Sequence, residues 1–317
     1  MANAKKIEKI VVLGTGGTIA GQAGQAQDHV GYVAGELSVQ AVLASVAGVA
    51  DILGSVDLIS EQVAQLDSKD MDAETWHALA MRVRHWAGQS GVGAVLVTHG
   101  TDTLEETAWF LAQTCAVDCP VVLVSAMRPA SALAPDGPQN LRDALVVALD
   151  PRSRGVLAVS AGAVHAARHV RKEHPYRVDA FASGEAGALG WIEAGQVRWQ
   201  HPVVTDVPVN MDLRPPAQWP WVEVLTSHAM AQGSTVDALV AAGVRGLVVA
   251  ATGNGTVHAQ WQQALLRARQ KGVSVWISTR CAQGQVVRPS SEACEWGVFC
   301  DLPPLKARIS LMLDLMP

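Results

Sequence analysis

The 317-residue chain has little of several features that define particular protein classes. It has only five cysteines, none in a Cys-x-x-Cys pair, so we expect neither a disulfide-stapled scaffold nor a zinc ribbon. Lysine and arginine number 24 against 29 acidic residues, so the basic excess of nucleic-acid-binding proteins is missing. No apolar run approaches the roughly 18 residues of a membrane-spanning helix. We therefore expect no nucleic-acid partner and no membrane partner.

The cysteine content and the N-terminal residues both favour the cytoplasm. Few, unpaired cysteines are typical of reduced thiols. The first residues, MANAKKIE, lead into an apolar strand without the apolar segment of a signal peptide. Hydrophobic residues make up 49% of the chain and charged residues 17%, which excludes a disordered chain and allows a sizeable core.

Apolar runs of four to six residues alternate with amphipathic segments through the first 200 residues. This alternation is typical of parallel strands covered by helices on both faces. The expected strands are 9–14, 93–98, 121–125 and 155–160, and the expected helices lie near 38–48, 71–88, 103–115 and 138–149.

A proline-rich stretch at 201–220, with five prolines in 20 residues, predicts a linker. Beyond it the alternation resumes, with strands expected at 222–226, 246–251 and 273–278 and helices at 236–242 and 257–270. The sequence therefore predicts an α/β protein with two doubly wound, mostly parallel-sheet domains. The larger N-terminal domain spans 1–200 and the smaller C-terminal domain spans 221–317.

The first strand ends in a glycine-rich turn over Gly14–Gly21, GTGGTIAG. In parallel sheets ligands bind at the carboxyl ends of strands, so this turn is a candidate site. Three interpretations remain open: a purely structural turn, a cradle of backbone N–H groups for an anion, or a nucleophilic hydroxyl on Thr15 or Thr18. A dinucleotide fingerprint is disfavoured because Ile19 stands where the third glycine is needed.

The next stretch, residues 21–35, is rich in glycine and has almost no apolar periodicity. We expect a mobile loop. It carries Tyr32, one of only two tyrosines in the chain. The loop is either a lid that closes over the turn or an ordinary surface loop.

A second polar segment, Thr98–Thr107, follows the strand at 93–98. Thr101 and Asp102 fall at the strand-to-helix turn, where they either contact a ligand or cap the helix. His99 is interpreted as a structural hydrogen-bonding residue. Thr103 and Glu106 fit a capping box at the start of the following helix.

A basic stretch, RHVRKEHPYR, occupies residues 168–177. It is either a solvated loop or a segment that turns one lysine into a site for proton relay. His165 and His169 are four residues apart, which alone is weak evidence for a metal. We expect neither a metal nor a cofactor.

Taken together and in this order, these segments resemble the bacterial-type L-asparaginase family, which includes the glutaminase-asparaginases. VLGTGGTIAG at 12–21 is similar to the family's first signature, and VTHGTDTLEETA at 97–108 to its second. Weaker similarities extend over DSKDM at 67–71, SAMRP at 125–129, DGPQN at 136–140 and KAR at 306–308. The similarity thus covers nearly the whole chain.

The resemblance implies hydrolysis of L-asparagine to L-aspartate and ammonia through a threonine acyl-enzyme ester, with L-glutamine as a second candidate substrate. Thr18 would be the nucleophile, and Tyr32 would assist its proton transfer. Thr101, Asp102 and Lys172 would form a second catalytic group. The implied substrate-binding residues are Gly17, Asp67, Ser68, Thr101 and Asp102.

The family further implies a homotetramer or homodimer. Its second domain usually contributes an asparagine and a glutamate, near whose places Met230 and Ser290 stand here. Lys69 replaces a glutamine that many members carry. Two alternatives keep the fold: a repurposed amino-acid-binding regulator and an amidase subunit of a transamidation complex.

Overall fold

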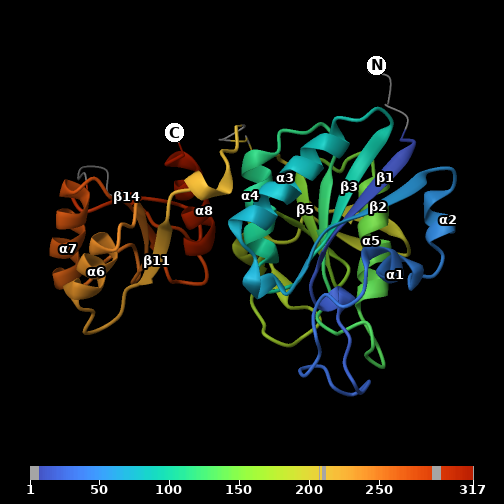
Figure 1. Cartoon of the computed structure of the whole chain (residues 1–317), viewed down its shortest axis with the longest axis horizontal. Coiled ribbons are helices and arrows are strands. Elements are labelled where there is room, and N and C mark those ends of the chain that lie inside the picture. The colour runs from blue at the N-terminus through green and yellow to red at the C-terminus, as the bar shows by residue number, and fades with distance from the viewer. Residues whose placement is uncertain (1–6, 207, 209–211, 288–293, 317) are drawn as a thin grey trace. The chain divides into compact units, whose positions relative to one another are not determined.

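The structure, a computed structural model, describes residues 7–206, 208, 212–287 and 294–316. Backbone contacts divide the chain into two compact units, Met1–Met211 and Asp212–Pro317. Each unit is a mostly or wholly parallel sheet flanked by helices (Figure 1). This confirms the predicted fold class of two parallel-rich α/β domains, the N-terminal one being the larger.

The first unit is built on an eight-stranded sheet with the order β10-β9-β6-β5-β4-β3-β1-β2. Five neighbouring strands run parallel, in the order β5, β4, β3, β1 and β2. Three further strands continue the sheet in antiparallel fashion. The strands are β1 (Lys9–Gly16), β2 (Asp57–Leu66), β3 (Val92–Thr98), β4 (Val121–Val124), β5 (Val156–Ser160), β6 (Ala163–Ala166), β9 (Gly190–Glu193) and β10 (Gln196–Trp199).

The sequence prediction missed β2 and the antiparallel strands, for two physical reasons. β2 is an edge strand with mostly half-buried residues, so polar side chains interrupt its apolar run. The β5–β6 and β9–β10 hairpins turn at Ala161–Gly162 and Ala194–Gly195, where the two alanines adopt φ values of 48° and 49°. Because such turns favour Asn-Gly or Asp-Gly, an Ala-Gly pair is a weak hairpin signal.

Helices cover both faces of this sheet. On one face Ile10 and Val12 pack among residues of α1 (Val39–Ala44), α2 (Val49–Leu53) and α5 (Gly137–Leu149). The intervening Val11 and Leu13 are fully buried on the other face, where α3 (Ala73–Ala87) and α4 (Leu104–Thr114) lie. Burial on both faces explains why these strands read as continuous apolar runs.

The second unit has a four-stranded parallel sheet with the order β11-β12-β13-β14. Trp261 and Val236, from two helices on one side, form its core with the strands. A third helix packs against β11, β12 and β13. The elements are β11 (Val222–Thr226), β12 (Gly246–Ala251), β13 (Ser274–Thr279), β14 (Val298–Phe299), α6 (Gly233–Ala241), α7 (Ala259–Gln270) and α8 (Pro304–Asp314).

Short elements follow the strands at the carboxyl edge of the first sheet. The 3-10 helix η1 (Thr18–Ala20) follows β1, and η2 (Ser68–Asp70) follows β2. A two-stranded ribbon pairs β7 (Arg171–Lys172) with β8 (Phe181–Ala182). Another 3-10 helix, η3 (Gly184–Ala186), follows β8, whereas η4 (Pro216–Gln218) belongs to the second unit. Among the described residues, no helix has both the length and the apolar character needed to cross a membrane.

Candidate functional site

The turn after β1 presents Thr18 from a backbone that only glycine can adopt. Gly17 has φ of 81°, and a Cβ atom there would lie 2.3 Å from the Cα of Gly100. The Gly17 N–H donates to the carbonyl of Leu66 at 2.9 Å, which joins the ends of β1 and β2. Thr18 follows at the start of η1 and is 5% exposed. Since the Gly17 N–H already has a protein acceptor, it is not available to an anion, which weakens the anion-cradle interpretation.

Thr18 and Tyr32 form a hydroxyl pair, with Oγ1 and the phenolic oxygen 2.6 Å apart. The Tyr32 ring lies over Gly21, where a Cβ would come within 2.8 Å of ring atom Cδ2. Burial raises the pKa of Tyr32 above its ordinary value of 10.0, opposed by the hydrogen bond to Thr18 and reinforced by the charges of Asp67 and Asp102. The phenol is therefore protonated at neutral pH.

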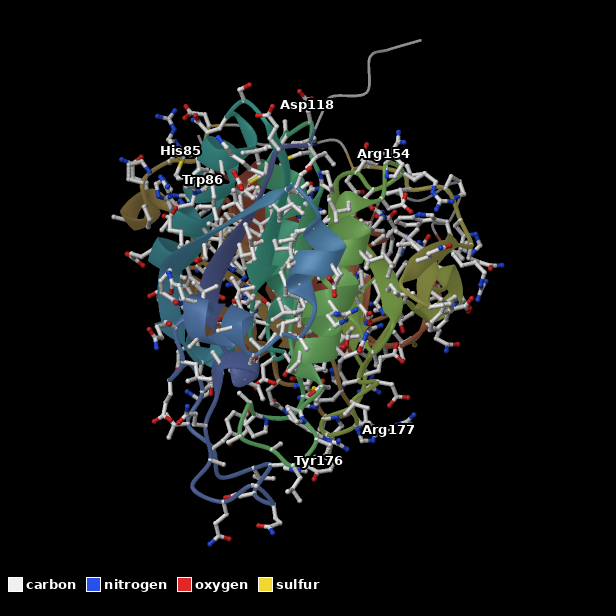
Figure 2. The ribbon with its side chains drawn as sticks, turned by 90° about the vertical axis from the view of Figure 1, so that its right-hand side faces the viewer. His85, Trp86, Asp118, Arg154, Tyr176 and Arg177 are labelled. Carbon is white, nitrogen blue, oxygen red and sulfur yellow. The ribbon has the colours of Figure 1, made fainter. Side chains whose placement is uncertain are left out.

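The loop that carries Tyr32 is held to the rest of the unit at several points. Gln22 and Val33 exchange two backbone hydrogen bonds of 3.0 and 2.8 Å that close the loop. The Ala23 N–H donates to Ser131 Oγ at 2.8 Å. Tyr176 lies at the end of the unit to which this loop extends (Figure 2), with its phenolic oxygen 3.4 Å from His29 Nδ1. In this structure the stretch expected to be mobile is a closed, tethered loop.

A second polar cluster joins Thr101, Asp102 and Lys172. Lys172 Nζ donates to Thr101 Oγ1 at 2.8 Å and to Asp102 Oδ1 at 2.6 Å. The lysine comes from β7, where pairing with Phe181 of β8 fixes its backbone. Its N–H also donates to the carboxylate of Glu105 at 3.2 Å. The basic stretch thus turns one lysine side chain towards the loop after β3.

Ser68 links the loops after β2 and β3. Its Oγ accepts a hydrogen bond of 3.2 Å from the Asp102 N–H, so its own hydroxyl hydrogen can be donated elsewhere. Its carbonyl accepts a bond of 2.8 Å from Thr103 Oγ1. Thr103 is the N-cap of α4, as predicted, but its side chain makes no capping hydrogen bond, so the Thr103 side of the predicted capping box is wrong. The hydroxyl is used to hold the Ser68 loop instead.

Asp67 and Lys69 flank Ser68. Asp67 is the N-cap of η2 and accepts a bond of 3.3 Å from the Lys69 N–H. Lys69 Nζ pairs with Asp70 and lies 4.0 Å from Asp67 Oδ2. The lysine charge beside Ser68 is therefore partly neutralised by its neighbours. Two further positions were singled out near the places of the family's second-domain asparagine and glutamate. Met230 is 81% exposed in the second unit, and Ser290 lies outside the described residues.

Gly100 belongs to the candidate site by its contacts, and the sequence interpretation missed it. A Cβ atom on it would lie 2.4 Å from Ser68 Oγ and 3.2 Å from the Cα of Gly17. The three loops after β1, β2 and β3 therefore meet at its backbone. The signal was present, since a glycine stands inside the polar segment between a strand and a helix.

The structure offers no arrangement for a metal in its described part, where no group of three or more His, Cys, Asp or Glu side chains is placed to hold one. The His165 ring bonds to Ser183 Oγ at 2.8 Å. None of the five cysteines, all of which lie in the described part of the chain, forms a disulfide.

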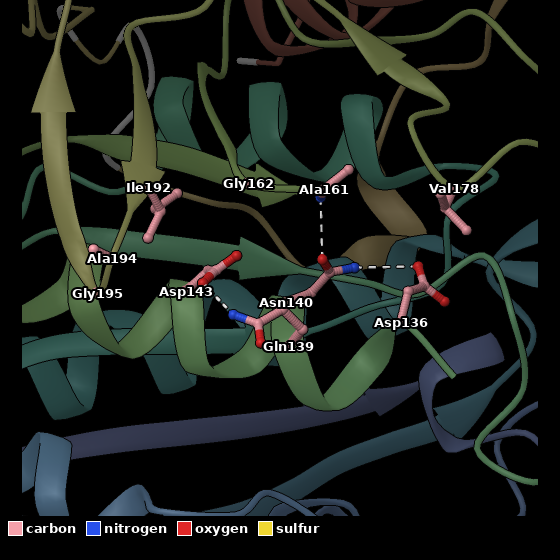
Figure 3. A pocket seen from close by; sticks show the side chains of 10 residues that line it. All are labelled: Asp136, Gln139, Asn140, Asp143, Ala161, Gly162, Val178, Ile192, Ala194 and Gly195. Atoms are coloured by element: carbon pink, nitrogen blue, oxygen red, sulfur yellow. Dashed lines mark hydrogen bonds between the residues drawn. The ribbon is translucent and has the colours of Figure 1, made fainter. Parts of the chain in front are cut away.

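A separate cavity of about 460 Å³ lies beside the start of α5 and the turns of the β5–β6 and β9–β10 hairpins (Figure 3). Asn140 donates to Asp136 and accepts from the Ala161 N–H, which fixes the first hairpin turn. Asp143 accepts from Gln139 at 2.8 Å, and burial raises the pKa of its carboxyl. None of the residues that line this cavity is among the predicted site residues.

Comparison with known proteins places the chain among amide-hydrolysing enzymes. The family model "Asparaginase, N-terminal" matches residues 9–205, and "Glutaminase/Asparaginase C-terminal domain" matches residues 221–316. The probable periplasmic L-asparaginase of Haemophilus influenzae is 36% identical over 322 residues, covering 99% of this chain and 90% of the relative. The glutaminase-asparaginase of Pseudomonas fluorescens biotype A is 33% identical and covers 98% and 87%.

A solved structure agrees with these relatives. The probable cytoplasmic L-asparaginase from Campylobacter jejuni matches with a TM-score of 0.89 at 36% identity, covering 97% of this chain and 95% of that one. The two family models follow each other along the chain in the order of the two units. The chain therefore belongs to the asparaginase family of enzymes.

Proposed function

We propose that this chain hydrolyses the side-chain amide of L-asparagine to L-aspartate and ammonia, with Thr18 as the nucleophile. The observation that carries the assignment is the 2.6 Å contact between Thr18 Oγ1 and the Tyr32 hydroxyl. A threonine hydroxyl is a weak nucleophile at neutral pH and needs a neighbour that takes its proton. Membership of the asparaginase family supports the reaction class.

In the first step Thr18 Oγ1 bonds to the amide carbon, and the bond from that carbon to nitrogen breaks. The threonine proton passes to the Tyr32 oxygen while the Tyr32 proton moves to the leaving nitrogen, which departs as ammonia. In the second step water attacks the ester, and the same relay returns a proton to Thr18. Because its pKa is raised, Tyr32 acts as a neutral relay and not as a standing phenolate.

Charged groups around Ser68 and Asp102 suit the amino-acid end of the substrate. Asp102 Oδ1 is occupied by Lys172, but within the described residues no hydrogen bond uses Oδ2. We assign Oδ2 to the α-ammonium group. The free Ser68 hydroxyl hydrogen suits the α-carboxylate, with Asp67 and Gly17 shaping the same end of the site.

The cluster of Thr101, Asp102 and Lys172 is assigned to the second proton-transfer group. Thr101 Oγ1 accepts from Lys172 Nζ, so its own hydrogen can be donated to the substrate or to the attacking water. Lys172 at the same time fixes the carboxylate of Asp102 in place. One lysine therefore organises both a hydroxyl and a carboxylate.

Ammonia release from L-asparagine and, separately, from L-glutamine tests the proposal. We expect the wild type to release ammonia from asparagine and the Thr18→Ala variant to have no measurable turnover. Thr15→Ala is the matched control and should keep its turnover. Thr15 lies on the same turn as Thr18, but its hydroxyl donates to the Thr98 carbonyl and not to Tyr32. Turnover by folded Thr18→Ala would refute the nucleophile, and a folded wild type that only binds the amino acid would favour the regulator alternative.

Two further expectations accompany the proposal. We expect a homotetramer or homodimer, which light scattering coupled to gel filtration measures. The relatives include both a periplasmic and a cytoplasmic protein by name. A cytoplasmic location for this chain therefore stays a prediction, to be tested by cell fractionation.

A further inference from the structure

A buried chain of hydrogen bonds runs from α3 to the loop after β3. Trp76 Nε1 and Thr107 Oγ1 are 2.9 Å apart, and Thr107 Oγ1 and His99 Nε2 are 2.8 Å apart. His99 Nδ1 then lies 2.7 Å from the carbonyl oxygen of Gly100. His99 and Thr107 have no exposed surface, and Trp76 is 6% exposed. Burial lowers the pKa of His99 to about 4, so the ring is neutral at pH 7.

The two ends of this chain fix the direction of every bond. An indole N–H can only donate, so Thr107 Oγ1 accepts from Trp76 and its own hydrogen is left for His99. A carbonyl oxygen can only accept, so His99 Nδ1 must carry the hydrogen that faces Gly100. Both constraints select the same neutral tautomer, with Nδ1 protonated and Nε2 accepting.

The carbonyl held by His99 belongs to the peptide that joins Gly100 to Thr101. In a planar trans peptide the C=O and N–H groups point in opposite directions. Since the carbonyl faces the buried ring, the Thr101 N–H points away from it. Among the described residues, no hydrogen bond uses that N–H as a donor. It is a free backbone donor on a residue that is itself 5% exposed.

The residue that carries this N–H donor follows Gly100, which packs against the turn after β1 that presents Thr18. Gly100 packs so tightly against Gly17 and Ser68 that a Cβ on Gly100 or Gly17 would come within 2.4 Å of its neighbour. Thr18 and Thr101 directly follow these two contacting glycines in the sequence. A backbone N–H in this place is suited to the negative charge that develops on the amide oxygen during attack.

We propose that His99 is a positioning residue, which sets the orientation of the Gly100–Thr101 peptide so that the Thr101 N–H serves as an oxyanion donor. The inference rests on the proposed amidohydrolase function for its catalytic consequence. His99 contacts neither substrate nor reacting atoms in this scheme. Thr107 and Trp76 hold the ring in the tautomer that the task requires.

Two substitutions separate the contact with Gly100 from the rest of the network. His99→Asn keeps an N–H donor at the position of Nδ1 but loses the group that faces Thr107. His99→Gln keeps a polar group at the position of Nε2 but loses the donor to the carbonyl. We expect His99→Gln to lower kcat by about tenfold to a hundredfold with KM changed less than about threefold. The His99→Asn variant should recover most of that loss.

A purely structural role for His99 predicts a different result. In that case kcat would follow the thermal stability of the variants and not the presence of an N–H donor at the position of Nδ1. Melting temperatures of both variants are therefore measured beside the kinetics. Equal kcat in His99→Gln and the wild type, or a lower kcat in His99→Asn than in His99→Gln at similar stability, would overturn the proposal.

Nuclear magnetic resonance keeps the test independent of activity. The ¹⁵N shifts of the wild-type ring at pH 7 should show the Nδ1–H tautomer, and the Thr101 amide resonance should move in His99→Gln more than in His99→Asn. An Nε2–H tautomer or an unmoved Thr101 amide would refute the positioning role. A wild type that releases no ammonia would instead refute the proposed function, while the shifts would still report on His99.

Discussion

Replacing Tyr32 by phenylalanine removes the hydroxyl oxygen that lies 2.6 Å from Thr18 Oγ1 and leaves the ring over Gly21 in place. If the phenol relays the threonine proton, its loss should reduce kcat in the range typical of general acid–base groups, about 10²- to 10⁴-fold. At about 1.36 kcal/mol for each tenfold change, this corresponds to roughly 3–5 kcal/mol of transition-state stabilisation. KM should change little, because no substrate-binding role is assigned to the phenol.

The chain supplies its own control, since Tyr176 is the only other tyrosine and is 59% exposed. Tyr176→Phe should keep kcat within about twofold. Steady-state ammonia release and a single-turnover measurement of ester formation distinguish slow acylation from slow hydrolysis. A Tyr32→Phe variant with normal kcat, or with only KM raised, would show that the relay argument is wrong.

The pH dependence gives a second check on the same residue. A tyrosine with a raised pKa keeps its proton to higher pH than an ordinary tyrosine. Any loss of kcat/KM caused by ionisation of Tyr32 should therefore have its midpoint at higher pH than for an ordinary tyrosine, and it should vanish in Tyr32→Phe. An alkaline loss that persists in this variant belongs to another group.

Three further predictions test other parts of the site and the fold. Gly17→Ala should lower both the melting temperature and kcat, because a Cβ would clash with Gly100 at positive φ, whereas Gly24→Ala has nothing within 4 Å and should change neither. Asp102→Asn should raise KM for asparagine by about tenfold or more, since charged hydrogen bonds exceed neutral ones. Because Asp102 also pairs with Lys172, kcat should fall as well, and it is an unchanged KM that would contradict the assignment to the α-ammonium group. Asp143 has a pKa raised by burial, so the folded state holds its proton more tightly and stability falls as pH rises past the ordinary value of 3.8. Asp143→Asn should therefore unfold at higher urea than the wild type at pH 7, with the difference closing below pH 4.

The sequence predicted most of the parallel framework because those strands are buried on both faces. β1, β3, β4 and β5 read as apolar runs for this reason, and their ends located the loops that carry Thr18 and Thr101. β2 was missed because an edge strand needs fewer apolar residues. The hydrophobic periodicity of the sequence also could not show that Lys172 contacts Thr101, which lies 71 positions earlier. That contact depends on the pairing of β7 with β8.

The Thr103 side chain shows a limit of predictions made from neighbouring residues in the sequence. Thr103 stands at the N-cap position that its type predicts, yet its hydroxyl donates to Ser68. A local rule scores only neighbours in sequence, whereas the Ser68 carbonyl comes from a loop 35 positions earlier. A tertiary contact with the Ser68 loop has displaced a local one, which is expected where a candidate site and helix stability compete for one side chain.

The Thr18–Tyr32 pair and the cluster of Thr101, Asp102 and Lys172 have different surroundings, and this difference suits the two threonines to different roles. Thr18 pairs with a phenol that is neutral at pH 7, so it can lose a proton without separating charge first. Thr101 instead accepts from Lys172, whose other partner is a half-exposed carboxylate. A hydroxyl that accepts from a cation is held as a donor towards the opposite side, which suits a group that delivers or orients a proton. The geometry therefore favours Thr18 over Thr101 as the atom that attacks, and Thr101→Val should retain a burst of ester formation that Thr18→Ala lacks.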